Sequence, residues 1–179
     1  MTKFTKRMKR LFAWGTALLL VGGMQAASLP VDEPITPVDY VSTLVGTQSK
    51  HSLSTGNTYP AVAMPWGMNF WTPQTGTMGN GWAYTYDADK IRGFKQTHQP
   101  SPWINDYGQF AIMPVTGKVA FDQDERASWF SHKAETATPY YYKVYLADHD
   151  VTTEIVPTER AAMFRFTYPE TNNAYMVLD

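Results

Sequence analysis

The stretch YYYKVYLADHDVTTEIVPTERAAMFRFTYPETNNAYMVLD, residues 140–179, decides the fold. Its β-branched and aromatic residues gather in runs typical of strands, which we expect at residues 140–146, 151–156, 161–168 and 175–178. Short polar turns separate these runs, for example at residues 148–150 and 169–173. Such hairpin-like spacing predicts an all-β protein, an antiparallel β-sandwich.

The sequence before this stretch contains further strand candidates and few helix signals. We expect strands at residues 68–72, 82–86, 110–115 and 118–121, and exposed loops at residues 122–127 and 135–139. Alternation in the second of these strands places Trp82, Tyr84 and Tyr86 on one face. Residues 65–67 predict a tight turn, and we expect Trp66 and Trp71 to lie in the core.

The N-terminus has the pattern of a secretory signal peptide. Five basic residues and no acidic residue occur within residues 1–10, followed by an apolar run to Met24 and then by Ala26 and Ala27. We expect a signal peptide at residues 1–27, an irregular lead-in at 28–37 and the sandwich domain at 38–179. The protein is then exported, to the periplasm or the exterior, and contains no membrane span because the apolar run is too short.

Composition excludes several classes of function. The chain has no cysteine, which excludes disulfides and thiolate metal sites. It has 15 basic and 16 acidic residues, so losing the five basic residues of the leader changes the net charge from −1 to −6. An acidic mature domain is a poor nucleic-acid binder.

Residues 93–114 form the candidate binding region, a loop between two strand-like ends. Pro100 and Pro102 stiffen it, and aromatic and polar side chains are concentrated between them and Gly108. Aromatic faces and nearby donors and acceptors are the groups that hold a sugar ring. The candidate substrate-binding residues, including one from the preceding aromatic strand, are Trp82, His98, Gln99, Trp103, Asp106 and Tyr107.

Structural roles for the same residues stay open. Trp103 could cap the core, His98 could fix the loop through a hydrogen bond, and Asp106 could be an Asx-turn residue before Gly108. A glycosidase needs two carboxyl groups placed across the scissile bond. Only Asp106 lies among Trp, His and Tyr residues, so we expect no catalytic residue in this chain. The four histidines lack metal-ligand spacing, and we expect no metal site.

A series of ordered motifs resembles a known enzyme family. The sequence resembles family-92 glycoside hydrolases, the calcium-dependent exo-α-mannosidases, first at Asp39-Tyr40-Val41, at residues 56–60 and at residues 64–68. The later motifs are Gly93-Phe94, Thr97-His98, Asp106-Tyr107-Gly108, Phe130-Ser131-His132, Pro139 with Tyr141-Tyr142, Thr158-Glu159-Arg160 and Phe164-Arg165-Phe166-Thr167. They are similar in order and spacing to the N-terminal β-sandwich of that family.

The resemblance implies a mannose-containing glycan as substrate and an inverting mechanism. It also implies a second, (α/α)6 domain that supplies the general acid, the general base and most calcium ligands, and that domain is absent from these residues. We therefore expect a truncated, incomplete sandwich whose missing strands leave an unpaired edge. The residues after His98, Gln99 to Trp103, depart from the Ser-Gly-rich pattern associated with α-1,2-mannosidases. The competing hypothesis is a stand-alone carbohydrate-binding sandwich without catalytic activity.

Overall fold

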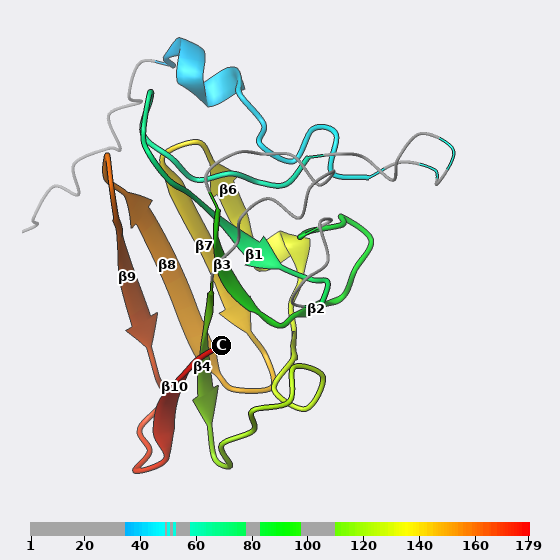
Figure 1. Cartoon of the computed structure of the whole chain (residues 1–179), viewed down its shortest axis with the longest axis vertical. Helices are drawn as coiled ribbons and strands as arrows, with labels where there is room; N and C mark the ends of the chain where they lie inside the picture. Colours follow the sequence, from blue (N-terminus) through cyan, green and yellow to red (C-terminus); the bar gives the residue numbers. More distant parts are fainter. Residues whose placement is uncertain (1–34, 49, 51, 53–57, 78–82, 98–109) are drawn as a thin grey trace, which may run out of the picture. The chain divides into compact units, whose positions relative to one another are not determined.

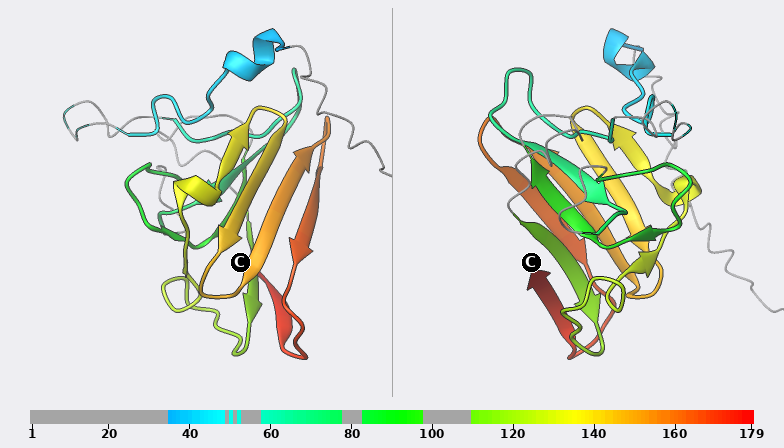
Figure 2. Two further views of the ribbon diagram at one scale, coloured as in Figure 1. Left: turned by 180° about the vertical axis from the view of Figure 1, so that it is seen from behind. Right: turned by 45° about the vertical axis from the view of Figure 1, so that its right-hand side comes forward.

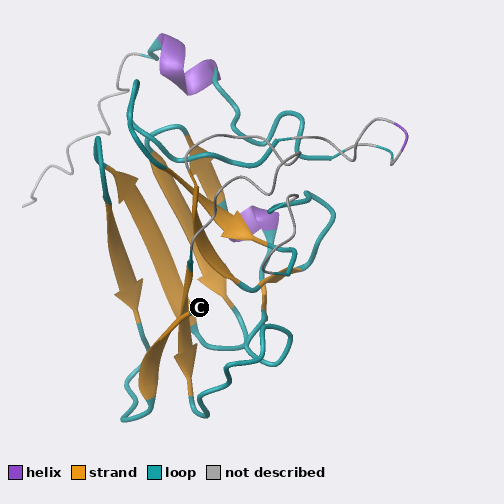
Figure 3. Cartoon of the chain, in the orientation of Figure 1, coloured by secondary structure: helices purple, strands orange, loops and turns teal. Residues whose placement is uncertain are grey.

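Two antiparallel sheets dominate the computed structural model, which describes residues 35–48, 50, 52, 58–77, 83–97 and 110–179. All of these residues belong to one unit, Ile35–Asp179. Only short 3-10 turns interrupt the β-structure, among them η1 (Pro37–Tyr40) and η4 (His132–Ala134), as Figure 3 shows. The all-β, antiparallel sandwich is confirmed.

The first sheet has the strand order β1-β3-β4-β10, and the second has the order β6-β7-β8-β9 (Figure 1). The first sheet consists of β1 (Phe70–Gln74), β3 (Gly93–Thr97), β4 (Ala111–Thr116) and β10 (Ala174–Leu178). The second consists of β6 (Thr136–Thr138), β7 (Tyr141–Leu146), β8 (Val151–Pro157) and β9 (Ala162–Thr167). A small pair, β2 (Lys90–Ile91) and β5 (Ser128–Trp129), completes the set.

Aromatic side chains fill the space between the two sheets. Trp71 on β1 meets Phe164 on β9 edge to face, with ring centroids 4.8 Å apart. Phe94 on β3 meets both Tyr142 on β7, at 6.2 Å, and Phe164, at 6.5 Å. Edge-to-face pairs of this kind stabilise beyond the area that they bury. The core expected for Trp71 is therefore confirmed.

The loop before β5 is anchored to the first sheet by a buried arginine. The guanidinium of Arg126 donates to the carbonyl oxygens of Phe121, at 2.7 Å, and Arg92, at 3.2 Å, and forms an ion pair with the carboxylate of Asp179. The prediction of an exposed loop at residues 122–127 is thus wrong at its end, where Arg126 and Ala127 are buried. A buried charge is retained here because each of the three guanidinium nitrogens donates to an acceptor.

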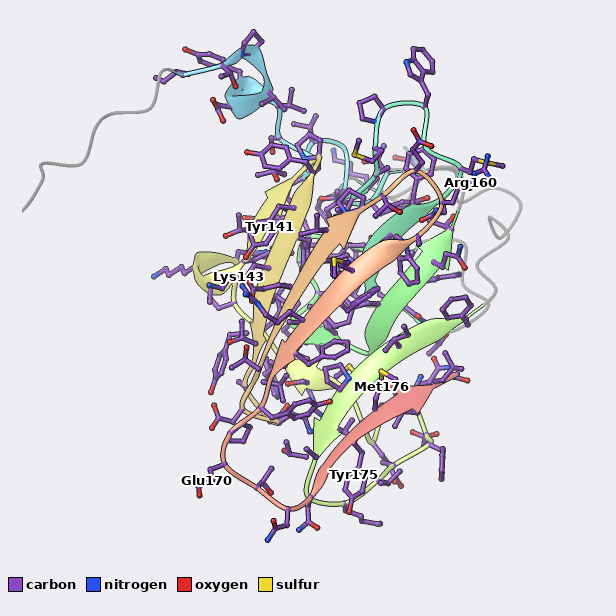
Figure 4. All side chains as sticks on the ribbon, turned by 90° about the vertical axis from the view of Figure 1, so that its left-hand side faces the viewer. Tyr141, Lys143, Arg160, Glu170, Tyr175 and Met176 are labelled. Atoms are coloured by element: carbon purple, nitrogen blue, oxygen red, sulfur yellow. The ribbon has the colours of Figure 1, made fainter. Side chains whose placement is uncertain are left out.

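The strands β9 and β10 stand at the ends of their sheets in the described part of the chain. Val177 on β10 pairs with Met113 on β4, and both side chains are buried in the core. The flanking residues Met176 and Leu178 lie on the opposite face of β10 and are 59% and 66% exposed. The edge strand β10 therefore presents apolar side chains to the outside, and Figure 4 labels Met176 there.

Four local expectations are wrong. Residues 118–121 and 83–86 are not strands, since neither segment has a ladder partner in the described structure. Residues 136–138 form β6 rather than an exposed loop. Trp66 occupies the predicted turn, closed by the Gly67 N–H donating to the Met64 carbonyl at 2.9 Å, but with a φ of 59° it stands in this turn fully exposed rather than in the core.

Among the described residues, no helix is long and apolar enough to cross a membrane.

Candidate functional site

The six predicted substrate-binding residues lie outside the described residues. Trp82 belongs to residues 78–82, and His98, Gln99, Trp103, Asp106 and Tyr107 belong to residues 98–109. Their predicted roles stay predictions. The described part of the site therefore consists of the residues that flank these segments and of the side chains that contact those flanking residues.

The described ends of three segments meet beside β1 and β3. Tyr59, which follows residues 53–57, donates its hydroxyl to Thr97, the last residue of β3, at 3.2 Å. Thr75 and Gly76 each donate a backbone N–H to the Ala83 carbonyl, which closes the chain across residues 78–82. Tyr59, Ala83 and Tyr84 form one buried cluster. The two segments that contain the predicted binding residues, 78–82 and 98–109, are thus joined to the fold beside this buried cluster.

A strip of buried polar side chains runs along β1 and β3 next to these ends. Thr72 and Lys95 are cross-strand partners, and alternation places Gln74 and Thr97 on the same face, opposite to Phe94. All four are buried. Hydrophobic packing alone does not favour hydroxyl, amide and ammonium groups at buried positions. The strip therefore indicates a polar environment next to the three segment ends.

A buried carboxylate, Glu135, supports the opposite side of this region. Its side chain is 1% exposed, and its Oε1 accepts hydrogen bonds from the hydroxyls of Tyr142, at 2.6 Å, and Tyr84, at 3.2 Å. Its Oε2 lies 2.5 Å from Nδ1 of His132, while Nε2 of His132 lies 2.6 Å from the Tyr86 carbonyl oxygen. The network joins η4 and β7 to residues 84–86, and Figure 2 shows η4 beside β7.

The tyrosines of this network act as hydrogen-bond donors. Burial, and then the charge of the neighbouring Glu135, raises the pKa of Tyr84 and of Tyr142 well above the ordinary tyrosine value. Both phenols consequently keep their protons and donate to the carboxylate. His132 completes the arrangement by stacking on the Tyr86 ring, with centroids 3.9 Å apart and an interplanar angle of 2°.

An open pocket lies next to this network. Its lining combines aromatic, acidic and basic side chains, namely Tyr86, Asp87, Asp89, Phe130, His132 and Lys133. Sequence reasoning missed Glu135, because its segment lacked a strand-like pattern and was interpreted as an exposed loop. The available signal was the spacing from His132 to a glutamate three residues later, followed by the tyrosine-rich run of β7.

The described residues contain no group of three or more His, Cys, Asp or Glu side chains that could hold a metal ion. This part of the chain does not fit a calcium site.

Comparisons with known proteins define the class: the chain carries an N-terminal domain of a glycosyl hydrolase. The family model of the glycosyl hydrolase family 92 N-terminal domain matches residues 40–179. The chain therefore belongs to glycoside hydrolase family 92.

Solved structures of this family share the fold. An inverting mannosidase of family 92 from Bacteroides thetaiotaomicron is 54% identical, with a TM-score of 0.73 over 79% of this chain and 19% of that one. An α-mannosidase of the same family and organism, solved with mannoimidazole, is 35% identical, with a TM-score of 0.70 over 79% and 19% of the two chains.

A curated relative points in the same direction. A protein of Arthroderma benhamiae (strain ATCC MYA-4681 / CBS 112371), described as an uncharacterized secreted glycosidase, is 25% identical over 140 residues, which cover 74% of this chain and 17% of that protein. The chain thus spans about a fifth of the length of these relatives.

Proposed function

We propose that this chain is the N-terminal domain of a secreted, exo-acting α-mannosidase, in which its loop residues form part of the sugar pocket. The observation that carries the proposal is the 54% identity to an inverting mannosidase over 79% of the chain. The meeting of the segment ends at Tyr59, Ala83 and Thr97 supports it, because loops on a rigid scaffold are the usual carriers of binding residues.

The role of this chain is to bind and orient the mannose. The indoles of Trp82 and Trp103 supply stacking faces, while His98, Gln99, Asp106 and Tyr107 supply hydrogen bonds to its hydroxyls. Inversion requires one carboxylic acid to protonate the glycosidic oxygen and one carboxylate to activate water on the opposite face. We assign both groups, and the ligands of a calcium ion that helps to distort the sugar ring, to the part of the family outside this chain.

Export is part of the proposal. The basic and apolar N-terminal residues support a signal peptide, and the relative of A. benhamiae is described as secreted. The expected location is the periplasm or the exterior of the cell.

A chimera tests the proposed function. This chain would replace the aligned N-terminal portion of the B. thetaiotaomicron inverting mannosidase, and hydrolysis of an aryl α-mannoside would be measured with calcium present. We expect an active chimera, and a fall in kcat/KM on Trp103→Ala corresponding to about 1–3 kcal/mol of transition-state binding. A soluble, folded chimera without activity contradicts the proposal, and so does a Trp103→Ala chimera with unchanged kcat/KM.

The chain by itself is expected to show no mannosidase activity, because it lacks a placed pair of carboxyl groups. Turnover of the aryl mannoside by the purified chain, above that of a buffer blank, would contradict this. The alternative function is a stand-alone carbohydrate-binding module, for which the aromatic and polar candidate residues would suffice. Saturation-transfer NMR with methyl α-mannoside on the chain alone, together with an inactive chimera, would support that alternative.

A further inference from the structure

The surroundings of His132 determine how many protons its ring carries. Nδ1 lies 2.5 Å from a carboxylate oxygen of Glu135, and Nε2 lies 2.6 Å from the carbonyl oxygen of Tyr86. Both neighbours accept hydrogen bonds, and a neutral imidazole has only one N–H. A neutral ring beside an ionised Glu135 would therefore direct one lone pair at an oxygen.

A second histidine of the same chain shows the opposite arrangement. Nδ1 of His149 accepts a hydrogen bond from the Thr116 N–H at 3.4 Å, and its Nε2 lies 2.8 Å from the Arg126 carbonyl oxygen. One donor and one acceptor satisfy a neutral ring with its proton on Nε2. His149 therefore serves as a reference for His132 within the same molecule.

We propose that His132 and Glu135 are positioning residues that hold residues 84–86 as an imidazolium–carboxylate pair, in support of the sugar site of the proposed function. Two tyrosine hydroxyls donate to Glu135, so its Oε1 acts as an acceptor for both of them. The His132 ring lies parallel to the Tyr86 ring at 3.9 Å, a position in which a cation is attracted to the ring face. The pair is the bridge between η4 and the segment that directly follows Trp82.

The pair responds to pH in a definite direction. Both contacts of His132 are made while the ring carries two protons, and one of them is lost when a proton leaves, so the bridge weakens as pH rises. Besides Glu135, the titratable groups around the ring are Tyr84, Tyr86, Tyr142, Asp87, Asp89 and Lys133. The tyrosines of raised pKa, Tyr84 and Tyr142, remain neutral donors.

The protonation state is tested by NMR on the full chain labelled with 15N-histidine. At neutral pH, long-range 1H–15N correlations should show an imidazolium at His132 and a neutral ring protonated on Nε2 at His149. In Glu135→Gln the amide can donate to Nδ1, so His132 should change to the neutral form protonated on Nε2. The matched control Glu159→Gln, at an exposed acid, should leave both rings unchanged. A neutral His132 in the unmodified chain overturns the proposal, as does an unchanged His132 signal in Glu135→Gln.

The positioning role is tested in the chimera described above. We expect Glu135→Gln to lower kcat/KM on the order of tenfold, because displaced loops cost activity, and to flatten its decline with rising pH. Glu159→Gln should have the activity and pH profile of the unmodified chimera. If the chimera is active and Glu135→Gln changes neither its kcat/KM nor its pH profile, the positioning role is overturned. A chimera without activity instead contradicts the proposed function, and the NMR result still decides the state of His132.

Discussion

Two neighbouring tyrosines on β7 bind two glutamates in contrasting surroundings. Tyr142 donates to Glu135 at 2.6 Å inside the protein, and Tyr141 donates to Glu154 at 2.6 Å on the outer face of the second sheet, where Figure 4 labels it. Each carboxylate also has a basic side chain as partner, His132 for Glu135 and Arg165 for Glu154. The hydrogen-bond chemistry is nearly the same, while the access of water differs.

The difference shows how solvent sets the energetic weight of a contact. Glu135 and its partner His132 are 1% and 28% exposed, whereas Glu154 and its partner Arg165 are 11% and 72% exposed. Water therefore reaches the outer pair more readily than the inner one, and an unpaired buried polar group costs its full desolvation free energy. We therefore expect substitutions at the two glutamates to differ strongly in the free energy of unfolding.

The largest effect is expected for Glu135→Ala. The change removes the acceptor for Tyr84, Tyr142 and His132 and should lower the free energy of unfolding by about 3 kcal/mol, since breaking a buried pair leaves its partners uncompensated. Urea unfolding followed by circular dichroism measures it. Glu154→Ala is the matched variant, and a loss at Glu154 equal to that at Glu135 would contradict the comparison.

Removing single tyrosine hydroxyls should lower the free energy of unfolding by smaller amounts, again more at the inner pair than at the outer one. Tyr142→Phe leaves Glu135 with one buried donor fewer and should cost about 1–2 kcal/mol. Tyr141→Phe, one residue away, should cost less because water can approach Glu154. The comparison fails if the urea midpoint of Tyr141→Phe is the lower of the two.

Acid should lower the stability of the protein through the protonation of Glu154. Hydrogen bonds from Arg165 and Tyr141 lower the pKa of Glu154 to about 2, from an ordinary value of 4.5. A lowered pKa means that the stabilisation is present above the unfolded value and is lost as pH falls from 4.5 towards 2. Glu154→Gln should abolish this part of the acid dependence, as measured by melting temperature against pH. If the melting temperature of Glu154→Gln falls with decreasing pH as steeply as that of the unmodified chain, the interpretation is wrong.

Salt should have the smallest effect and should act on the outer pair alone. The contacts of Arg165 to Glu154, at 2.5 and 2.6 Å, are reached by counter-ions, and exposed charge pairs are screened. We expect the stability difference between the unmodified chain and Arg165→Met to shrink in high salt. The corresponding difference for Tyr142→Phe should stay constant, and a salt-sensitive Tyr142→Phe difference would contradict this.

The strands of the second sheet were predictable because their signals are local. Residues 141–146, 151–157 and 162–167 carry continuous β-branched and aromatic patterns and lie within a residue or two of the predicted positions. The β6 strand was missed because it is three residues long and holds two threonines and an alanine. Its pairing with β7 comes from tertiary structure rather than from propensity.

Burial was harder to predict than strand position. Trp71 and Trp66 are five residues apart and were assigned to the core together, but Trp66, in a turn with a positive φ, is fully exposed. Glu135 shows the reverse error, since an acid is ordinarily a surface residue and its burial depends on three partners, of which His132 and Tyr142 are near in sequence and Tyr84 is 51 residues away. The support of the site is a property of tertiary contacts, and a single sequence contains them only indirectly.

The edge strands β9 and β10 carry exposed methionines, which has a consequence for redox chemistry. Met176 on β10 and Met163 on β9 are 59% and 74% exposed, so peroxide can reach both thioethers. Oxidation to the sulfoxide turns a flexible apolar side chain into a polar one. An oxidising medium would thus make the outward faces of these two strands more hydrophilic, and peptide mass spectrometry after brief peroxide treatment should find Met163 and Met176 oxidised before the buried Met113.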